Sequence, residues 1–205
     1  MKHTLNDLLS IVYRFYRHAK SYDDLGPDEE RLMAFRDTEA LIAARRQAGS
    51  KEPYEQWQAM LDRLCVCFPG RGSRNHSIHL PTGSFDACYI GRIDLPPLVG
   101  ENSRELGFLV SFLVPYYVVY TSRITHLDPY DPANEWQSIR QQISFTFAAD
   151  EEPYVREIVR EIEATYSGYE PMPPEVGNVI VPDVFVTNQC LGEGTLFHCL
   201  FTDAW

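Results

Sequence analysis

The histidines, cysteines and closely spaced acids of this chain are the residues whose spacing could support chemistry. His76 and His79 lie three positions apart, and on the strand predicted for them their side chains point to opposite faces, which does not suit a metal-binding pair. Cys65 and Cys67 are not accompanied by a second Cys or His pair at zinc-finger spacing. We therefore predict no metal site and no cofactor.

Catalysis by a nucleophile, or by acids and bases, has no clearer signature. The sequence contains no G-x-S-x-G, P-loop or G-x-G-x-x-G motif. Cys199 and His198 are adjacent, so on a predicted strand they point to opposite faces and cannot act as nucleophile and base. Other combinations stay open, namely Cys65 or Cys88 with a distant His, and Asp86 with Asp94 or Asp203. We expect a protein without catalytic residues, and not an enzyme.

The composition predicts one compact domain over residues 1–205. With 44% hydrophobic residues, the chain can form one well-covered core. The apolar run over residues 106–120 is shorter than the roughly 17 to 20 residues of a membrane-spanning helix, and it contains Pro115. Its Val, Phe, Leu and Tyr content favours a buried strand, or two strands broken near Pro115.

The N-terminal residues and the cysteines indicate the compartment. The first twenty residues contain no uninterrupted apolar segment, so we expect no secretory signal. The five cysteines are an odd number, which favours reduced thiols over a disulfide framework. We therefore expect a cytoplasmic protein.

Hydrophobic periodicity and turn residues predict the elements that position these side chains. Helices are expected over residues 28–48, 50–68 and 153–166. Strands are expected over residues 11–16, 76–80, 85–94, 106–125, 143–148, 179–181, 184–187 and 195–201. The predicted fold class is α+β, a single domain with a largely antiparallel sheet and about three helices packed on it.

Charge is distributed unevenly along the chain, whose net charge is −11. Residues 1–75 carry twelve Lys and Arg against eleven Asp and Glu, whereas residues 76–205 carry six against eighteen. No lysine follows Lys51. Such a field repels nucleic acid and anionic membrane surfaces, and it raises the encounter rate with cationic partners by about 10- to 10³-fold. We therefore expect a cationic protein partner, and no nucleic acid or membrane.

Several stretches carry a family resemblance. They are HLPTGSFDACYIGRIDLP (79–96), LGFLVSFLVPYYVVYTSRI (106–124), EPMPPEVGNVIVPDV (170–184) and LGEGTLFHCLFTDAW (191–205), with IVYRFYR (11–17) and EALIAARRQAG (39–49) near the N-terminus. Together they resemble a family of bacterial immunity proteins encoded beside polymorphic toxins, including toxins of type VI secretion systems with a restriction-endonuclease-like nuclease domain. The resemblance implies an immunity protein that neutralises a cognate toxin in a stoichiometric complex.

A polar loop and a run of acids are the predicted partner-binding residues. In the loop over residues 127–136, Tyr130 and Trp136 are the expected anchors, and Asp128, Asp131 and Glu135 are the expected steering charges. The acidic run is Asp150, Glu151 and Glu152. Two alternatives stay open: a small cytoplasmic enzyme, and a chaperone or adaptor that delivers a toxic effector. The oligomeric state is left open as well.

Overall fold

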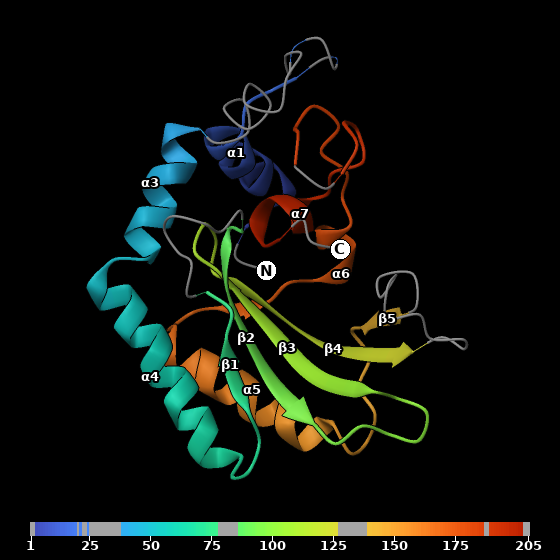
Figure 1. Cartoon of the computed structure of the whole chain (residues 1–205). Coiled ribbons are helices and arrows are strands. Elements are labelled where there is room, and N and C mark those ends of the chain that lie inside the picture. The colour runs from blue at the N-terminus through green and yellow to red at the C-terminus, as the bar shows by residue number, and fades with distance from the viewer. Residues whose placement is uncertain are drawn as a thin grey trace.

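The centre of the molecule is one sheet with helices on both sides (Figure 1). The computed structural model describes residues 3–19, 21, 24, 38–77, 86–126, 139–186 and 189–202. The strands are β1 (Ser73–Asn75), β2 (Cys88–Leu95), β3 (Ser103–Ser111), β4 (Tyr116–His126), β5 (Ile139–Ser144) and β6 (Glu170–Pro171). The first five follow one another across the sheet as antiparallel neighbours, while β6 pairs with β4 in parallel. The predicted α+β class with a largely antiparallel sheet is confirmed.

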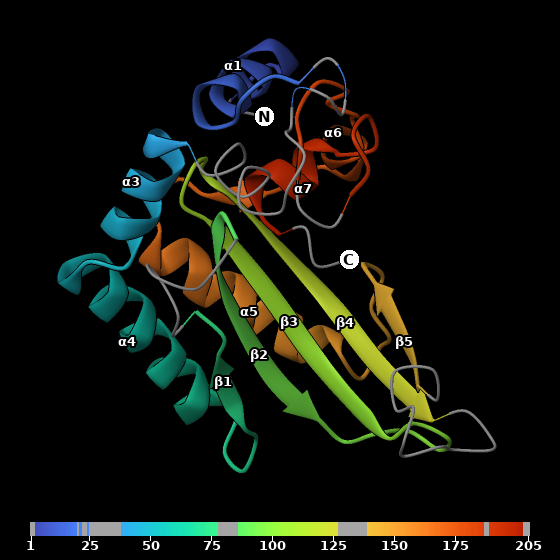
Figure 2. The same cartoon turned by 45° about the horizontal axis from the view of Figure 1, so that its top comes forward.

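Helices form a layer on each face of the sheet (Figures 1 and 2). They are α1 (Leu5–Phe15), α3 (Glu39–Ala48), α4 (Lys51–Cys67), α5 (Glu152–Thr165), α6 (Pro174–Gly177) and α7 (Leu196–Leu200). α4 and α5 cover one face, and their core includes Trp57 and Ile158. α1, α6 and α7 gather on the other face, at the end where β3 turns into β4, and their core includes Leu8 and Leu200.

Successive side chains of β3 and β4 point alternately into the two cores. Phe108 of β3 lies opposite Val119 of β4, and both belong to the core beneath α4 and α5. Their neighbours Leu109 and Val118 also lie opposite each other and belong to the other core. Because successive side chains of a strand point to opposite faces, a strand buried on both faces must be apolar throughout. The uninterrupted apolar run is therefore two sheet strands, with Pro115 in the turn between them.

Two of the predicted helices are confirmed over their whole length, and one in part. α4 and α5 match the helices expected over residues 50–68 and 153–166. The side chains of Trp57, Leu61 and Leu64 are buried on one face of α4, at the spacing that predicted the helix. α3 ends at Gly49 as expected, and residues 28–37 lie outside the described part of the chain.

The strand predicted over residues 11–16 is wrong, because this segment belongs to helix α1. The Thr4 hydroxyl accepts the Asp7 N–H at 3.2 Å, and the Asp7 carboxylate accepts the Thr4 N–H at 2.8 Å. This reciprocal cap starts a helix. Leu8 and Val12, one turn apart, are fully buried. Tyr13 and Phe15, whose alternation with polar residues suggested a strand, are only partly buried on this helix.

The strand predicted over residues 195–201 is also wrong, since α7 occupies it. The Thr195 hydroxyl accepts the His198 N–H at 3.4 Å, and His198 Nδ1 accepts the Thr195 N–H at 3.1 Å. The His198 side chain thus helps to cap the N-terminus of α7, the helix to which it belongs. Cys199 is fully buried beside the capping histidine.

The remaining predicted strands are shifted or reduced. β2 begins three residues later than expected, and β5 overlaps the expected strand 143–148 only at its last two residues. β1 precedes the expected strand 76–80, of which residues 78–80 lie outside the described part. The two short strands expected over residues 179–187 are represented by isolated bridges, Ile180 with Thr195 and Val184 with His18.

Gly107 allows the tightest side-chain contact within the sheet, and its replacement tests that contact. A Cβ at this position would lie 2.0 Å from the ring carbon Cζ of Tyr120. The side chain of Tyr120 is almost fully buried. We expect Gly107→Ala to lower the free energy of unfolding by about 1–3 kcal/mol, because a buried ring cannot move aside without strain. Urea denaturation monitored by circular dichroism measures this change in the free energy of unfolding.

Gly177→Ala is the matched control for this substitution. The nearest atom to a Cβ at that position is 3.7 Å away, an ordinary contact distance. Equal stability losses in the two variants would contradict the assigned packing of Tyr120 over Gly107.

Candidate functional site

An open, largely apolar groove lies at the outer edge of β4. It encloses about 700 Å³, between β5 on one side and β6, α6 and α7 on the other. α5 closes it from the face of the sheet that α4 and α5 cover, and Val155 and Val159 of α5 line it there. Grooves of this size that are mostly apolar and hold a few polar groups are typical of binding sites.

The groove exists because two strands share one edge of β4. β5 pairs with β4 from Thr121 to His126, and β6 pairs with Tyr116 and Tyr117. On this edge, residues 118–120 have no strand partner among the described residues. After Ser144 the chain bends away from β4 before it starts α5, so the edge stays open between the two paired regions.

Both faces of the sheet contribute side chains to the groove. Val118 and Phe197 reach it from the core beneath α1 and α7, and Val119 and Val155 reach it from the core beneath α5. A ligand in the groove would therefore contact both layers of the molecule at once. It would bury apolar surface at roughly 25 cal/mol per Å².

Phe145 is the most exposed aromatic side chain of the groove. Phe145 is 52% exposed, yet its ring lies edge-on to that of Phe197, with the ring centroids 6.3 Å apart. Large exposed aromatic side chains beside an apolar wall are enriched among the residues that anchor protein partners. Phe145 thus packs against Phe197 while about half of its surface stays exposed.

Acids flank the apolar wall that α5 contributes. Glu152, Val155, Val159 and Glu163 follow one another at spacings of three and four, so they share one helix face. Glu163 accepts a hydrogen bond from the Tyr117 hydroxyl at 2.8 Å. Burial, and then this carboxylate, raise the pKa of the Tyr117 hydroxyl, so it stays protonated and acts as a donor.

Two exposed acids lie close in sequence to residues that line the groove. Glu152 on α5 and Glu175 on α6 are exposed, and neither forms an ion pair with a described residue. Residues 139–202, which provide most of the walls, carry ten Asp and Glu against three Arg, a net charge of −7. Glu152 lies one turn before the lining residue Val155, and Glu175 directly follows the lining residue Pro174, so we call these two acids the anionic rim of the groove.

The structure places the predicted partner-binding residues in different settings. The loop residues Asp128, Tyr130, Asp131, Glu135 and Trp136 lie outside the described part of the chain. Asp150 is exposed, but its carboxylate accepts a hydrogen bond from Arg104 at 2.7 Å, which holds the pKa of that carboxyl below its usual value. Glu152 is exposed and lies one turn from Val155, so it belongs to the groove rim.

Glu151 is a correction to the expectation that all three acids face a partner. Its side chain is fully buried, 2.9 Å from Arg123 and 3.1 Å from the Thr121 hydroxyl, and it also accepts the Ala148 N–H. Burial raises the pKa of this carboxyl, but these hydrogen bonds outweigh burial, and the pKa lies below its usual value. Arg104 lies 3.6 Å away. Glu151 therefore holds β4 to the start of α5 and offers no surface charge.

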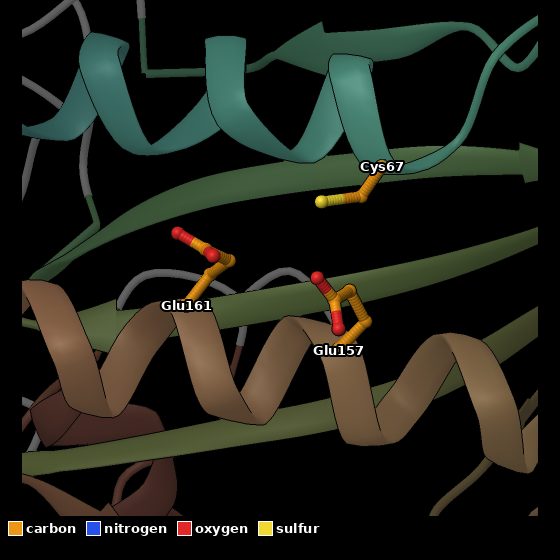
Figure 3. A group of neighbouring side chains, drawn as sticks. All are labelled: Cys67, Glu157 and Glu161. Atoms are coloured by element: carbon orange, nitrogen blue, oxygen red, sulfur yellow. The ribbon is translucent and has the colours of Figure 1, made fainter.

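A second cluster joins α4 to α5 and resembles a metal site in its donor atoms. The thiol of Cys67 and the carboxylates of Glu157 and Glu161 point toward one another (Figure 3), and their ligand atoms lie within 4.8 Å. Both carboxylates are already paired with arginines: Arg63 lies 2.7 Å from Glu161, and Arg160 contacts both acids. A divalent cation would have to displace a guanidinium, so we interpret the cluster as an interhelical ion-pair network.

The other candidates for chemistry are dispersed. All five cysteines are free thiols, and Cys88 and Cys199 are buried. Asp94 is paired with Arg74, at the opposite edge of the sheet from the groove. His79 and Asp203 lie outside the described residues. The open catalytic combinations therefore stay untested, and none of Cys65, Cys88, Asp86 and Asp94 lines the groove.

Sequence reasoning missed the groove. The residues that line it come from five separate segments, and the spacing within any one of them predicts only a strand or a helix. Phe145 was available as a signal, since it lies in the alternating apolar and polar stretch over residues 143–148, which continues beyond β5. Its exposure follows from the bend after Ser144, which the sequence pattern does not reveal.

Comparison with known proteins leaves the family open. No protein-family model matches the chain, and no curated protein or solved structure matches it significantly. No helix within the described residues is long and apolar enough to cross a membrane.

The buried position of Glu151 makes a stability and pH prediction. We expect Glu151→Gln to lower the free energy of unfolding by about 3 kcal/mol near pH 7, because Arg104 and Arg123 lose a buried counter-charge. The pKa of Glu151 is lowered on folding, so its contribution is present above about pH 4.3, the unfolded value, and is lost as the pH falls through the folded value. Denaturant titrations from neutral to acidic pH measure both effects.

The wild type should therefore lose more stability than the Gln variant between about pH 5 and the acid limit. Glu152→Gln, at the neighbouring exposed position, is the control and should leave the wild-type pH profile nearly unchanged. Parallel pH profiles for the wild type and Glu151→Gln would contradict this role.

The Cys67 cluster makes a prediction about thiol reactivity. A hydrogen bond to Glu157, and then burial, raise the pKa of the Cys67 thiol, which keeps it protonated. Both Cys65 and Cys67 are exposed, and the thiolate is the reactive form, so iodoacetamide should alkylate Cys67 more slowly than Cys65 at pH 8. Glu157→Gln should accelerate alkylation of Cys67, and Glu152→Gln should not. Peptide mass spectrometry follows each site, and an unchanged rate in Glu157→Gln would exclude the proposed hydrogen bond.

Proposed function

We propose that this protein is an immunity protein, which binds a cognate bacterial toxin of the nuclease class and neutralises it in a stoichiometric complex. The observation that carries the proposal is the open apolar groove with an anionic rim, because such a surface suits a cationic protein partner. The resemblance of several stretches to immunity proteins supports the same role.

The charge of the partner follows from the charge of the groove walls. A nuclease must hold a polyanion, so its nucleic-acid site is lined with Lys and Arg. Beside the groove, the exposed acids Glu152 and Glu175 form no ion pair with a described residue, and residues 139–202 contain no lysine. Long-range attraction between these surfaces would speed capture of the toxin, which is the step that protects a cell.

Contacts with the apolar part of the groove would slow dissociation of the complex. Steering charges at a rim act mainly on the association rate, whereas desolvated aromatic anchors act mainly on the dissociation rate. Phe145 is the exposed anchor candidate, and its contact with Phe197 fixes its position before binding. A preformed anchor loses little conformational freedom when the partner arrives.

Co-expression with the product of the neighbouring reading frame tests the function. We expect that product alone to stop growth, and we expect this protein to restore growth and to co-purify with it. Raising the salt concentration should slow association, because exposed charges separated by more than about 8–10 Å are screened at physiological ionic strength. A neighbouring product that is harmless, or that kills cells equally well in the presence of this protein, contradicts the proposal.

The alternative role as a delivery adaptor predicts a different outcome of the same experiment. An adaptor would bind the full-length effector but would not rescue cells from its isolated toxin domain. Rescue from the isolated domain therefore decides for immunity.

Charge and anchor variants test whether the groove is the contact. The double change Glu152→Lys and Glu175→Lys should slow association with the toxin by roughly 3- to 10-fold at low ionic strength. Its control, Glu55→Lys with Asp62→Lys, makes the same charge change on the exposed side of α4, at the opposite edge of the sheet. Phe145→Ala should weaken binding by about 1–2 kcal/mol, mainly through faster dissociation. Surface plasmon resonance separates the two rates, and equal effects of the two charge pairs would place the contact elsewhere.

A further inference from the structure

The backbone of β4 points two hydrogen-bonding groups into the groove. Along a strand, the N–H and C=O of one residue point to one side, and those of the next residue point to the other. The Ile124 carbonyl accepts the Asn102 N–H on the β3 side at 2.8 Å, and the Tyr117 carbonyl accepts the Met172 N–H on the β6 side at 2.9 Å. Odd-numbered residues of β4 therefore direct their backbone groups away from β3.

Val119 is the odd-numbered residue between the two paired regions. Tyr117 is paired with β6 and Thr121 with β5, but no described strand residue pairs with Val119 on that edge. Its N–H and C=O both face the groove, and its side chain lines it. Unpaired groups at a sheet edge are a template on which another extended chain can add as a strand.

The walls of the groove suit the side chains of an added strand. Successive side chains of a strand point to opposite faces. On one face they would meet Val118 and Phe145, and on the other they would meet Val155 and Val159. Apolar residues are therefore favoured at consecutive positions of the incoming segment. The open edge spans residues 118–120, or roughly 10 Å of strand, so only a short extended segment fits in the plane of the sheet.

The rim charges select the source of that segment. Glu152 and Glu175 are exposed, neither forms an ion pair with a described residue, and each lies close in sequence to a residue that lines the groove. A second copy of this chain also carries a net charge of −11, so two copies would repel each other. A segment with Lys or Arg on both sides of its apolar centre would instead be attracted.

From this arrangement we infer that the groove binds a short, extended, apolar segment flanked by basic residues, which adds as a strand to the open edge of β4 at Val119. The identification of that segment as part of a toxin rests on the proposed function, whereas the mode of binding does not. The segment accepts a hydrogen bond from the Val119 N–H and donates one to the Val119 C=O.

A displayed library of random linear peptides, selected against the full-length protein, tests the inference without knowledge of the toxin. We expect the enriched peptides to have consecutive apolar residues flanked by Lys or Arg. In the ¹⁵N spectrum of the protein, the Val119 amide should shift and exchange more slowly with solvent when the best peptide is bound. The Val118 amide faces β3 and is already paired, so it is the internal control.

Backbone methylation of the bound peptide tests strand addition directly. Methylating the single amide that donates to the Val119 carbonyl should weaken binding by roughly threefold to tenfold, the usual effect of one lost hydrogen bond. Methylating the next amide, which points away from β4, should have a smaller effect. In the protein, Phe145→Ala should reduce peptide affinity, and Val66→Ala on α4, where the residue is 81% exposed, should not.

Several results would overturn the inference. They are a selection that enriches no peptide of this pattern, a Val119 amide that is unchanged by the bound peptide, equal effects of methylation at the two amides, and dimerisation of this chain through the groove. Rescue from the toxin combined with any of these results would leave the proposed function intact and place its contact on another surface. Peptide binding without rescue would leave strand addition intact and remove the toxin as partner.

Discussion

The division of one edge of β4 between two partner strands is the constraint on which the rest of the structure depends. Along its other edge, β4 pairs continuously with β3, which fixes the centre of the sheet. On the outer edge, β5 occupies one end and β6 the other, because the chain leaves β5 for α5 and returns only at Glu170. The gap between them connects the two cores to solvent. An unpaired, half-buried stretch of strand is tolerated only where water or a ligand can satisfy it, so this edge is also where function is to be sought.

Internal ion pairs determine which charges remain at the surface. Many arginines of the sheet and of the helices behind it are used inside the molecule, as in the pairs of Arg74 and Arg92 with Glu105, Arg104 and Arg123 with Glu151, and Arg63 with Glu161. The acids of these pairs are almost completely buried. Since paired charges cancel at a distance, the field that a partner meets is set by the acids left over, such as Glu152 and Glu175. The anionic rim is therefore a consequence of packing as much as of composition.

Local patterns predicted the elements that bury one clear stripe or run. α4 and α5 have apolar residues at helical spacing over about three turns or more, and β3 with β4 forms one long apolar run, so competing patterns were weak there. The patterns failed for α1 and α7, where aromatic and β-branched residues imitate a strand. In both, a side-chain cap at Thr4 or Thr195 starts a helix, and contact with the other helices of that layer buries one side of it. In short segments, such tertiary contacts determine the secondary structure more than the propensity of the residues does.

The sequence by itself determined the α+β class, the separation of a neutral N-terminal part from an acidic remainder, and the absence of lysine after Lys51. These properties depend on composition and on period, which are local. Only the tertiary structure decided that Glu151 is buried while Glu152 faces solvent, and that Val119 and Phe145 meet at one groove. Adjacent acids look alike in a sequence. Which of them is buried depends on what packs against it. For Glu151 these residues include Arg104 on β3 and Arg123 on β4, which are distant from it in the sequence.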